Sequence, residues 1–333
     1  MTTMAELALD VVGVGNAIVD VLAQADDGLL DELGLDKGAM TLIDAERADV
    51  LYGRMASAIE VSGGSAANTL TGIASFGGRG AYIGKVRNDQ LGAVFSHDIR
   101  AAGVDYRSRP VEEGAPTARC LIFVTPDAQR TMQTYLGVSV ELGPDDIDPE
   151  AIGAAQFTYL EGYLFDKEPA KEAFIKAAEL AHATGRKVAL SLSDPFCVDR
   201  HRGAFRHLVS GHVDVLFANE VEIVSLFEAG SFDDAVSAIR GHCEIAALTR
   251  GADGSMIVTA DEIVEIAAEP VGRVVDTTGA GDLFAAGVLF GLTQGFELGT
   301  CGRLGSIAAG EVIGHYGARP QSPLSDLAKR QAK

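Results

Sequence analysis

The 333-residue sequence has no tryptophan, only four cysteines, and far fewer basic than acidic residues. Without any CxxC pair, the cysteines indicate reduced thiols rather than a disulfide scaffold or a zinc site. The net charge of −20 argues against nucleic-acid binding, although a local site for an anion is compatible with it. The longest strongly apolar run, Leu283–Leu292, is too short to cross a bilayer, and the acidic N-terminus is unlike a signal peptide. We therefore expect a cytoplasmic protein with no nucleic-acid or membrane partner.

Several catalytic motifs are also missing. A Walker loop requires Ser or Thr after its Gly–Lys pair, but Gly84–Lys85 is followed by Val86. Gly13–Gly15 begins like a dinucleotide fingerprint, yet Ile18 occupies the third glycine position. The sequence also lacks HExxH and GxSxG, which disfavours zinc-protease and serine-hydrolase chemistry.

What the sequence does contain is an alternation of short apolar runs and helical patterns. Strand-like runs lie at 9–15, 80–84, 158–160, 187–192, 213–218, 245–249 and 255–259, and helical patterns at 63–76 and 170–184. This alternation predicts an α/β fold with a mainly parallel sheet and helices on both faces.

Two stretches interrupt that rhythm. Residues 26–58 carry two helical segments around an extended piece, and residues 117–135 alternate like antiparallel strands that turn at Pro126–Asp127. Because both stretches fall between core strands, we expect them to form a discontinuous lid that gates a ligand site. The predicted domains are a core of residues 1–15, 63–105 and 138–333 and a lid of residues 16–62 and 106–137.

The segment Asp276–Asp282, DTTGAGD, precedes a helix of small residues, and Val274–Val275 is expected to lead into it as a strand. Gly279 and Gly281 would let the backbone turn tightly and approach a ligand. The N–H groups of residues 280–282 at the helix start would then form an anion hole.

A carboxylate inside an anion hole makes sense if Asp282 accepts a proton from an attacking hydroxyl while the hole holds a phosphoryl group. Alternatively, Asp282 only caps the helix, and the motif alone leaves both interpretations open. Gly287 and Gly291, further along, are more typical of helix packing than of ligand contact.

Polar residues also follow other predicted strands. Asn16 and Asp20 suit a polyol substrate, as do the close-approach glycines and Asn68 of Gly63–Asn68, GGSAAN. The alternatives are ordinary turn and cap residues for the first pair and a tightly packed helix start for the second segment.

Two further strand ends suggest a nucleotide site. Asn219 and Glu222 would organise waters around Mg²⁺, or else form an acidic helix cap. Thr249–Gly251 would contact nucleotide phosphates, or else Arg250 makes an exposed salt bridge.

Together these motifs resemble the ribokinase-like family of sugar and nucleoside kinases over nearly the whole chain. The resemblance implies a three-layer α/β/α ribokinase-like sandwich with a smaller α+β lid, ATP as co-substrate and Mg²⁺ held through water by Asn219 and Glu222. It implies a catalytic group of Asp282, Gly279, Ala280, Gly281 and Arg130. It also implies substrate-hydroxyl contacts from Asn16, Asp20, Gly63, Gly64 and Asn68. The expected ATP contacts are Asn219, Thr249, Arg250, Gly251, Gly254, Thr278, Gly279, Gly281, His315 and Gly317.

Within the family, the lid segment and the turn Ser193–Phe196 most resemble the members that phosphorylate adenosine. This resemblance assigns the nucleoside pocket to Met40, Tyr135, Leu136, Tyr163 and Phe196. It implies conversion of adenosine to AMP in purine salvage, with a monomer favoured over a dimer and a monovalent cation near Asp276 left open. A ribokinase- or fructokinase-like sugar kinase is the alternative. A catalytically idle ligand sensor on the same fold is the alternative from another class.

Overall fold

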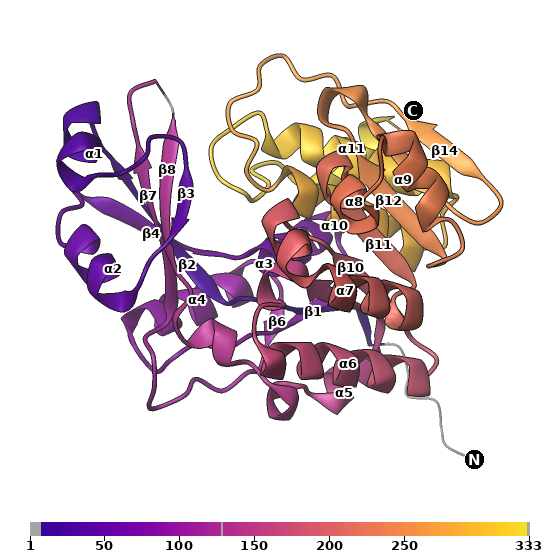
Figure 1. Ribbon diagram of the computed structural model, residues 1–333, viewed down its shortest axis with the longest axis horizontal. Coiled ribbons are helices and arrows are strands. Elements are labelled where there is room, and N and C mark those ends of the chain that lie inside the picture. Colours follow the sequence, from indigo (N-terminus) through magenta and orange to yellow (C-terminus); the bar gives the residue numbers. More distant parts are fainter. Residues whose placement is uncertain (1–7, 128, 332–333) are drawn as a thin grey trace.

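The computed structural model describes residues 8–127 and 129–331 (Figure 1). Residues 1–7, 128, 332 and 333, which belong to the expected core and lid segments, lie outside the described residues. The chain forms a nine-stranded sheet, called here the large sheet, and a five-stranded small sheet.

The large sheet confirms the predicted, mainly parallel α/β architecture. Its strands run in the order β14 (Ile263–Ile266), β13 (Ser255–Val258), β12 (Ile245–Thr249), β11 (Val215–Asn219), β10 (Lys187–Ser191), β9 (Ala155–Glu161), β1 (Leu9–Val14), β5 (Gly80–Ile83) and β6 (Asp105–Tyr106). The seven strands from β12 to β6 are parallel, so their carboxyl ends meet at one edge. Strand β13 is antiparallel to both of its neighbours, β12 and β14.

Helices cover both faces of the large sheet because alternate residues of its strands are buried on opposite sides. In β1, Val11 belongs to one apolar cluster, whereas Val12 and Val14 belong to the other. The first face carries α3 (Ser65–Phe76), α10 (Ala280–Thr293), α11 (Leu298–Val312) and α12 (Leu324–Gln331). The second face carries α5 (Pro149–Ala154), α6 (Glu168–Ala183), α7 (Pro195–His212), α8 (Glu220–Phe227) and α9 (Phe232–Ile239).

The small sheet is built from the two stretches that interrupt the core pattern. Its order is β3 (Met40–Leu42), β8 (Arg130–Tyr135), β7 (Ala118–Val124), β2 (Ile18–Gln24) and β4 (Ala58–Gly63), and it also carries α1 (Asp27–Leu33) and α2 (Ala45–Tyr52). The helix pair and the hairpin match the prediction. The sequence did not indicate β2, which pairs in parallel with β7 about a hundred residues later.

One face of the small sheet is covered by its own helices. Val19 and Val21 are buried with Leu30 and Leu51 of these helices. The intervening residues of β2 therefore lie on the opposite face, which in Figure 1 is the side toward the rest of the molecule. This alternation places Asp20 on the inner face. Helix α4 (Gln90–Ala101) packs against β4 at the base of the small sheet.

Two sequence expectations about the helix α10 region have different outcomes. The prediction of a strand at Val274–Val275 is wrong, because these residues belong to no sheet. The backbone N–H of Val275 donates instead to the Ile313 carbonyl at the end of α11. The packing role expected for Gly287 and Gly291 is confirmed. A Cβ at Gly287 would collide with the backbone of α11, and one at Gly291 would lie 2.8 Å from Cys301.

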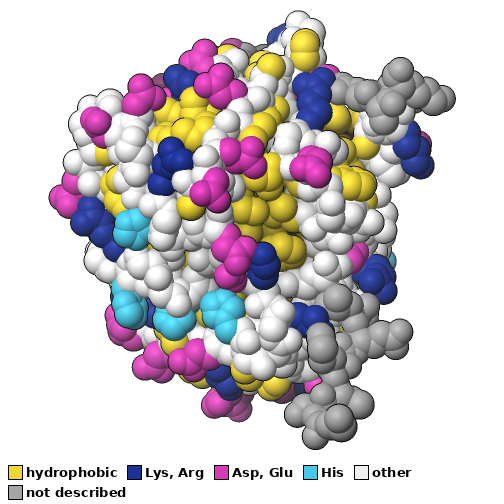
Figure 2. Space-filling view, turned by 90° about the vertical axis from the view of Figure 1, so that its right-hand side faces the viewer, with side chains coloured by type: hydrophobic (Ala, Val, Ile, Leu, Met, Phe, Trp, Pro, Cys, Tyr) yellow, Lys and Arg dark blue, Asp and Glu magenta, His cyan; other side chains and the backbone are white. Residues whose placement is uncertain are grey.

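The face of the molecule in Figure 2 carries side chains of both charges. Figure 2 shows acidic and basic side chains interspersed over one face rather than separated into patches. Across residues 8–127 and 129–331, every helix is too short or too polar to cross a bilayer. Short 3₁₀ turns complete the fold at Gly137–Glu141, Pro144–Asp146, Gly162–Leu164 and Gly251–Asp253.

Candidate active site

Asp282 lies in the first turn of α10 and is held by two donors from α3. The Ser65 hydroxyl donates to Oδ1 at 2.6 Å, and Asn68 Nδ2 donates to Oδ2 at 3.0 Å. The residue that caps α10 is Gly279, in the left-handed region at φ 80°, so Asp282 is not the helix cap. This removes the capping interpretation of the motif.

The surroundings of Asp282 make its carboxylate more basic than usual. Burial raises its pKa, and the hydrogen bonds from Ser65 and Asn68 oppose that rise. A carboxylate with a raised pKa is a better proton acceptor at neutral pH.

Only two of the three N–H groups expected to form an anion hole lack a backbone partner among the described residues. The Ala280 N–H donates to the Thr277 carbonyl at 3.2 Å within the turn, which leaves the N–H groups of Gly281 and Asp282 for a ligand. A Cβ added at Gly281 would meet no described atom within 4 Å, so the helix start opens on free space there. At Gly279, by contrast, a Cβ would lie 2.8 Å from Ala318.

Asp276 organises the loop before the hole. Its carboxylate accepts from Thr278 N (3.0 Å), Thr278 Oγ1 (2.7 Å) and Gly317 N (3.1 Å), and it pairs with Arg130 of β8. Burial acts to raise the pKa of Asp276, but these donors and the Arg130 guanidinium hold it below its usual value. The sequence left open whether a monovalent cation binds near Asp276. In the structure, the positively charged group beside Asp276 is the guanidinium of Arg130.

Asp20 stands on the inner face of the small sheet and accepts no hydrogen bond from any described residue. Burial raises its pKa to about 6, against the fields of Arg130 and Arg319. Gly63 lies opposite, and a Cβ there would be 2.6 Å from Asp20 Oδ2. Gly64, at φ 96°, passes against the Asn16 carbonyl. The glycines therefore let the two polar motifs approach each other.

Asn16 is buried, whereas the sequence suggested contact with a substrate. Its Nδ2 donates to Glu161 Oε1 at 2.8 Å, and the Ser139 hydroxyl lies 2.9 Å from its Oδ1. Glu161 also accepts from the backbone N–H of Ala66 at 2.8 Å. Sequence reasoning missed Glu161, although its position directly after a buried parallel strand is the same signal that singled out Asn16.

The residues assigned to a nucleobase are not part of the apolar core. Phe196, Met40 and Tyr163 have exposed fractions of 72%, 47% and 38%, whereas Tyr135 and Leu136 are half-buried at the end of β8. Phe196 follows the turn at Ser193, which has a φ of 68° that is strained for a non-glycine residue.

Asn219 and Glu222 form a reciprocal cap of α8. Asn219 Nδ2 donates to Glu222 Oε1 at 2.6 Å, and Glu222 N donates to Asn219 Oδ1 at 2.9 Å. Burial raises the pKa of Glu222 to about 7. No cluster of three or more metal-ligating side chains occurs among the residues the structure describes. The structure thus shows the helix-cap alternative for Asn219 and Glu222. Their oxygens are of the kind that bind waters of Mg²⁺.

The remaining predicted ATP contacts lie at the same end of the large sheet. Thr249 pairs in register with Asn219. Arg250 lies 3.8 Å from Glu220, as the salt-bridge alternative proposed, and its guanidinium stacks over Phe232. Gly251 and Gly254 both have positive φ. His315 Nε2 is 3.2 Å from Glu311, and Gly317 contacts Asp276 as described above.

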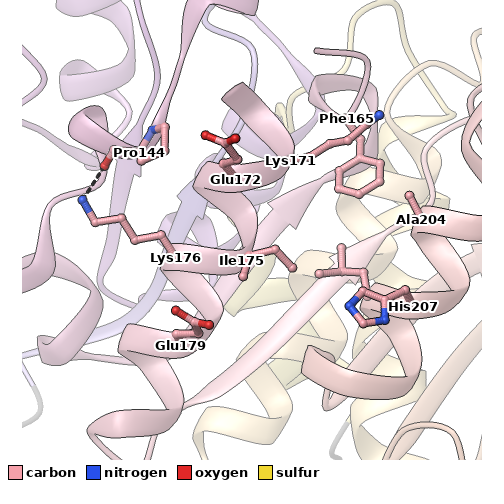
Figure 3. A pocket seen from close by; sticks show the side chains of 10 residues that line it. Pro144, Phe165, Lys171, Glu172, Ile175, Lys176, Glu179, Ala204 and His207 are labelled. Atoms are coloured by element: carbon pink, nitrogen blue, oxygen red, sulfur yellow. Dashed lines mark hydrogen bonds between the residues drawn. The ribbon is translucent and has the colours of Figure 1, made fainter. Parts of the chain in front are cut away.

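Among the hollows of the described surface, two differ in their relation to the predicted residues. One, of about 700 Å³, separates the small sheet from the loop after α11 and is lined in part by Leu22, Ile59, Arg130 and Tyr316. The other, of about 390 Å³, lies between α6 and α7 (Figure 3). Figure 3 shows Lys176 there donating to the Pro144 carbonyl. The first hollow includes predicted residue Arg130, whereas the second contains none of the predicted site residues.

Comparisons with known proteins identify the family of the chain. Residues 37–324 match the model of the pfkB family of carbohydrate kinases. The chain belongs to this family. Adenosine kinase from Sinorhizobium meliloti is 51% identical, with a TM-score of 0.90 over 98% of this chain and 99% of that one. A probable sugar kinase from Rhizobium etli is 50% identical, with a TM-score of 0.90 over 97% and 98%. An uncharacterized sugar kinase from Archaeoglobus fulgidus is 29% identical over 259 residues, which is 76% of this chain and 99% of its own length.

Family membership establishes a sugar or nucleoside kinase with the expected ribokinase-like fold. Kinases of this family use ATP together with Mg²⁺.

Buried carboxyls predict how the stability of this kinase depends on pH. Burial raises the pKa of Asp20, Glu161 and Glu222 to about 6, 7 and 7. Between pH of about 4.5 and 7 the folded state therefore binds more protons than the unfolded state, and the free energy of unfolding falls as pH rises. Urea denaturation at several pH values should show this slope, and Glu161→Gln should reduce it. Glu168→Gln, at an exposed position of α6, is the matched control and should keep it. An unchanged slope in Glu161→Gln would contradict the account.

Proposed function

We propose that this pfkB kinase transfers the γ-phosphoryl group of ATP to the 5′-hydroxyl of adenosine, giving AMP and ADP. The observation that carries the proposal is the Asp282 carboxylate, held by Ser65 and Asn68 next to two backbone N–H groups at the start of α10. A proton acceptor and an anion hole side by side are what phosphoryl transfer to a hydroxyl requires.

In the proposed reaction, Asp282 accepts the proton of the attacking hydroxyl. The hydroxyl oxygen forms a bond to the γ-phosphorus while the bond from that phosphorus to the β-phosphate bridging oxygen breaks, and ADP leaves. The N–H groups of Gly281 and Asp282 would stabilise the negative charge on the transferring group. Arg130 would add positive charge from the small sheet while it remains paired with Asp276.

The substrate hydroxyls would be held by Asp20 and the backbone at Gly63 and Gly64, whereas Asn68, whose amide is engaged at both ends by Asp282 and Arg319, would hold the base. Asp20 supports this role because its half-buried carboxylate accepts no hydrogen bond from the described residues. Asn16 takes a different role from the one first expected. Since both ends of its amide are engaged by Glu161 and Ser139, it would position the segment between β1 and β2 rather than contact the sugar.

The exposed apolar side chains favour a nucleoside over a free sugar. A small polyol needs polar partners around every hydroxyl, whereas Met40, Tyr163 and Phe196 offer apolar surface to the flat face of a purine. The likeness to the adenosine kinase of S. meliloti supports the same choice. The likeness to the R. etli sugar kinase supports the sugar-kinase alternative. An idle sensor would have no use for the intact Asp282 network.

The nucleotide side of the site would take ATP with hydrated Mg²⁺. Asn219 and Glu222 would bind waters of the metal, while Thr249–Gly251 and the loop at His315 and Gly317 would contact the nucleotide. We further propose that residues 16–62 and 106–137 close over the substrate as a lid. Closure would exclude water, which would otherwise compete for the phosphoryl group.

We also propose that the kinase acts as a cytoplasmic monomer in purine salvage. The support for a monomer is the outer face of the small sheet. That face is covered by α1 and α2, so it offers no bare sheet surface to a partner subunit.

Replacing the proposed base tests the reaction. Asp282→Asn keeps the shape of the side chain but cannot accept a proton, so kcat should fall by roughly 10²- to 10⁴-fold. Adenosine binding, measured by calorimetry, should change little. Asp326→Asn on the surface of α12 is the control. Equal losses of binding and turnover in Asp282→Asn would show that the residue is structural.

Removing an exposed ring tests the nucleoside pocket. Phe196→Ala should raise the KM for adenosine by about three- to tenfold, because the purine loses stacking and buried area, while kcat changes little. Phe296→Ala, which removes an exposed ring from the loop before α11, is the matched control. If both variants show the same KM as the wild type, Phe196 does not contact the base.

A further inference from the structure

Arg319, in the loop between α11 and α12, contacts Asn68, which is one of the two residues that donate hydrogen bonds to Asp282. Its Nε donates to Asn68 Oδ1 at 3.4 Å. The same Asn68 donates through Nδ2 to Asp282. Arg319 and Asn68 are 251 residues apart in the sequence, so only the fold brings them together.

Arg319 does not serve as an ordinary structural ion pair. No carboxylate of the described residues lies within 4.0 Å of its guanidinium, and its Nη2 is sealed from solvent without a hydrogen-bond partner. Burying a guanidinium nitrogen without a partner costs stability, so a purely structural role does not account for it. Its direct hydrogen bond to a described residue is the one to Asn68.

The chemistry of the three groups fixes the orientation of the Asn68 amide. A guanidinium can only donate hydrogen bonds, and an ionised carboxylate can only accept them. With Arg319 on one side and Asp282 on the other, the amide oxygen must face Arg319 and the amide nitrogen must face Asp282. The reversed amide would place two donors together on one side and two acceptors together on the other.

The guanidinium is also part of the charge balance around the substrate hydroxyls. Its field acts on Asp20, together with those of Arg130 and Asp282. Asp20, Asp98 and Tyr82 in turn act on Arg319. Arg319 therefore lies among the same groups that surround the proposed reacting hydroxyl.

We propose that Arg319 is a positioning residue for phosphoryl transfer, which orients the Asn68 amide so that its nitrogen holds the carboxylate of Asp282 in place. This inference rests on the proposed function, because it requires Asp282 to be the base. Sequence reasoning assigned the surrounding loop only to ATP and did not single out this arginine.

A double-mutant cycle between Arg319 and Asn68 tests the proposal. Arg319→Met should lower kcat with adenosine by about 10- to 100-fold, the scale of a misplaced reacting group, with little change in the KM for ATP. Asn68→Ala should lower activity as well. If Arg319 acts through Asn68, the double variant should be no slower than Asn68→Ala alone. Independent, multiplying losses would overturn the proposal, as would a rise in the KM for ATP at unchanged kcat.

Two further variants separate positioning from folding. Arg319→Lys keeps a charged donor and should recover part of the lost kcat, and added guanidinium ion should partly restore Arg319→Ala. A variant that has only lost stability would show neither recovery, and this outcome would contradict the proposal. Arg273→Met removes an exposed arginine from the loop before Asp276 and should leave kcat unchanged. Failure of the proposed function would appear instead in the wild type, which would then not phosphorylate adenosine.

Discussion

The two hydrogen bonds from α3 to the carboxylate of Asp282 are the contact on which the rest of the site depends. They join the start of α10 to the start of α3, so Asp282, the proposed base, and the glycine-rich segment before α3 are held as one unit. Glu161 extends this unit by binding Asn16 and the backbone N–H of Ala66. The start of α10, the start of α3 and the end of β9 are thus tied together by polar contacts, and they carry the proposed base, anion hole and substrate-contacting segment.

The link between Arg130 and Asp276 places the small sheet relative to that unit. Arg130 comes from β8, whereas Asp276 shapes the loop that leads into the anion hole. If the small sheet moves, the ion pair would therefore shift this loop as well. Closure of the proposed lid over a substrate would then change the position of the loop that precedes Asp282. Arg130 also donates to Thr278 Oγ1 at 2.9 Å, so a basic side chain of the small sheet lies against the loop before α10 in a chain whose net charge is −20.

Local patterns predicted the parts of the fold that depend on neighbouring residues. Parallel strands, the helix pair of the small sheet and the DTTGAGD turn each have a short-range signal in periodicity or glycine spacing. Strand β2 did not, because its stability comes from pairing with β7 rather than from its own pattern. The hydrogen-bond partners of the site residues could not be predicted from local patterns either. Arg130 and Asp276 are 146 residues apart, and Arg319 and Asn68 are 251 apart, so no local window contains both members of either pair.

The choice of acceptor is the central claim, and a comparison of acceptors tests it most directly. The value of kcat/KM should be measured for adenosine, inosine, guanosine, ribose and fructose on one preparation with ATP and Mg²⁺. The account predicts the highest value for adenosine, because the exposed side chains of Phe196, Met40 and Tyr163 would favour a purine over a free sugar. A higher value for ribose or fructose than for every nucleoside would contradict the proposed function and leave only membership in the pfkB kinase family.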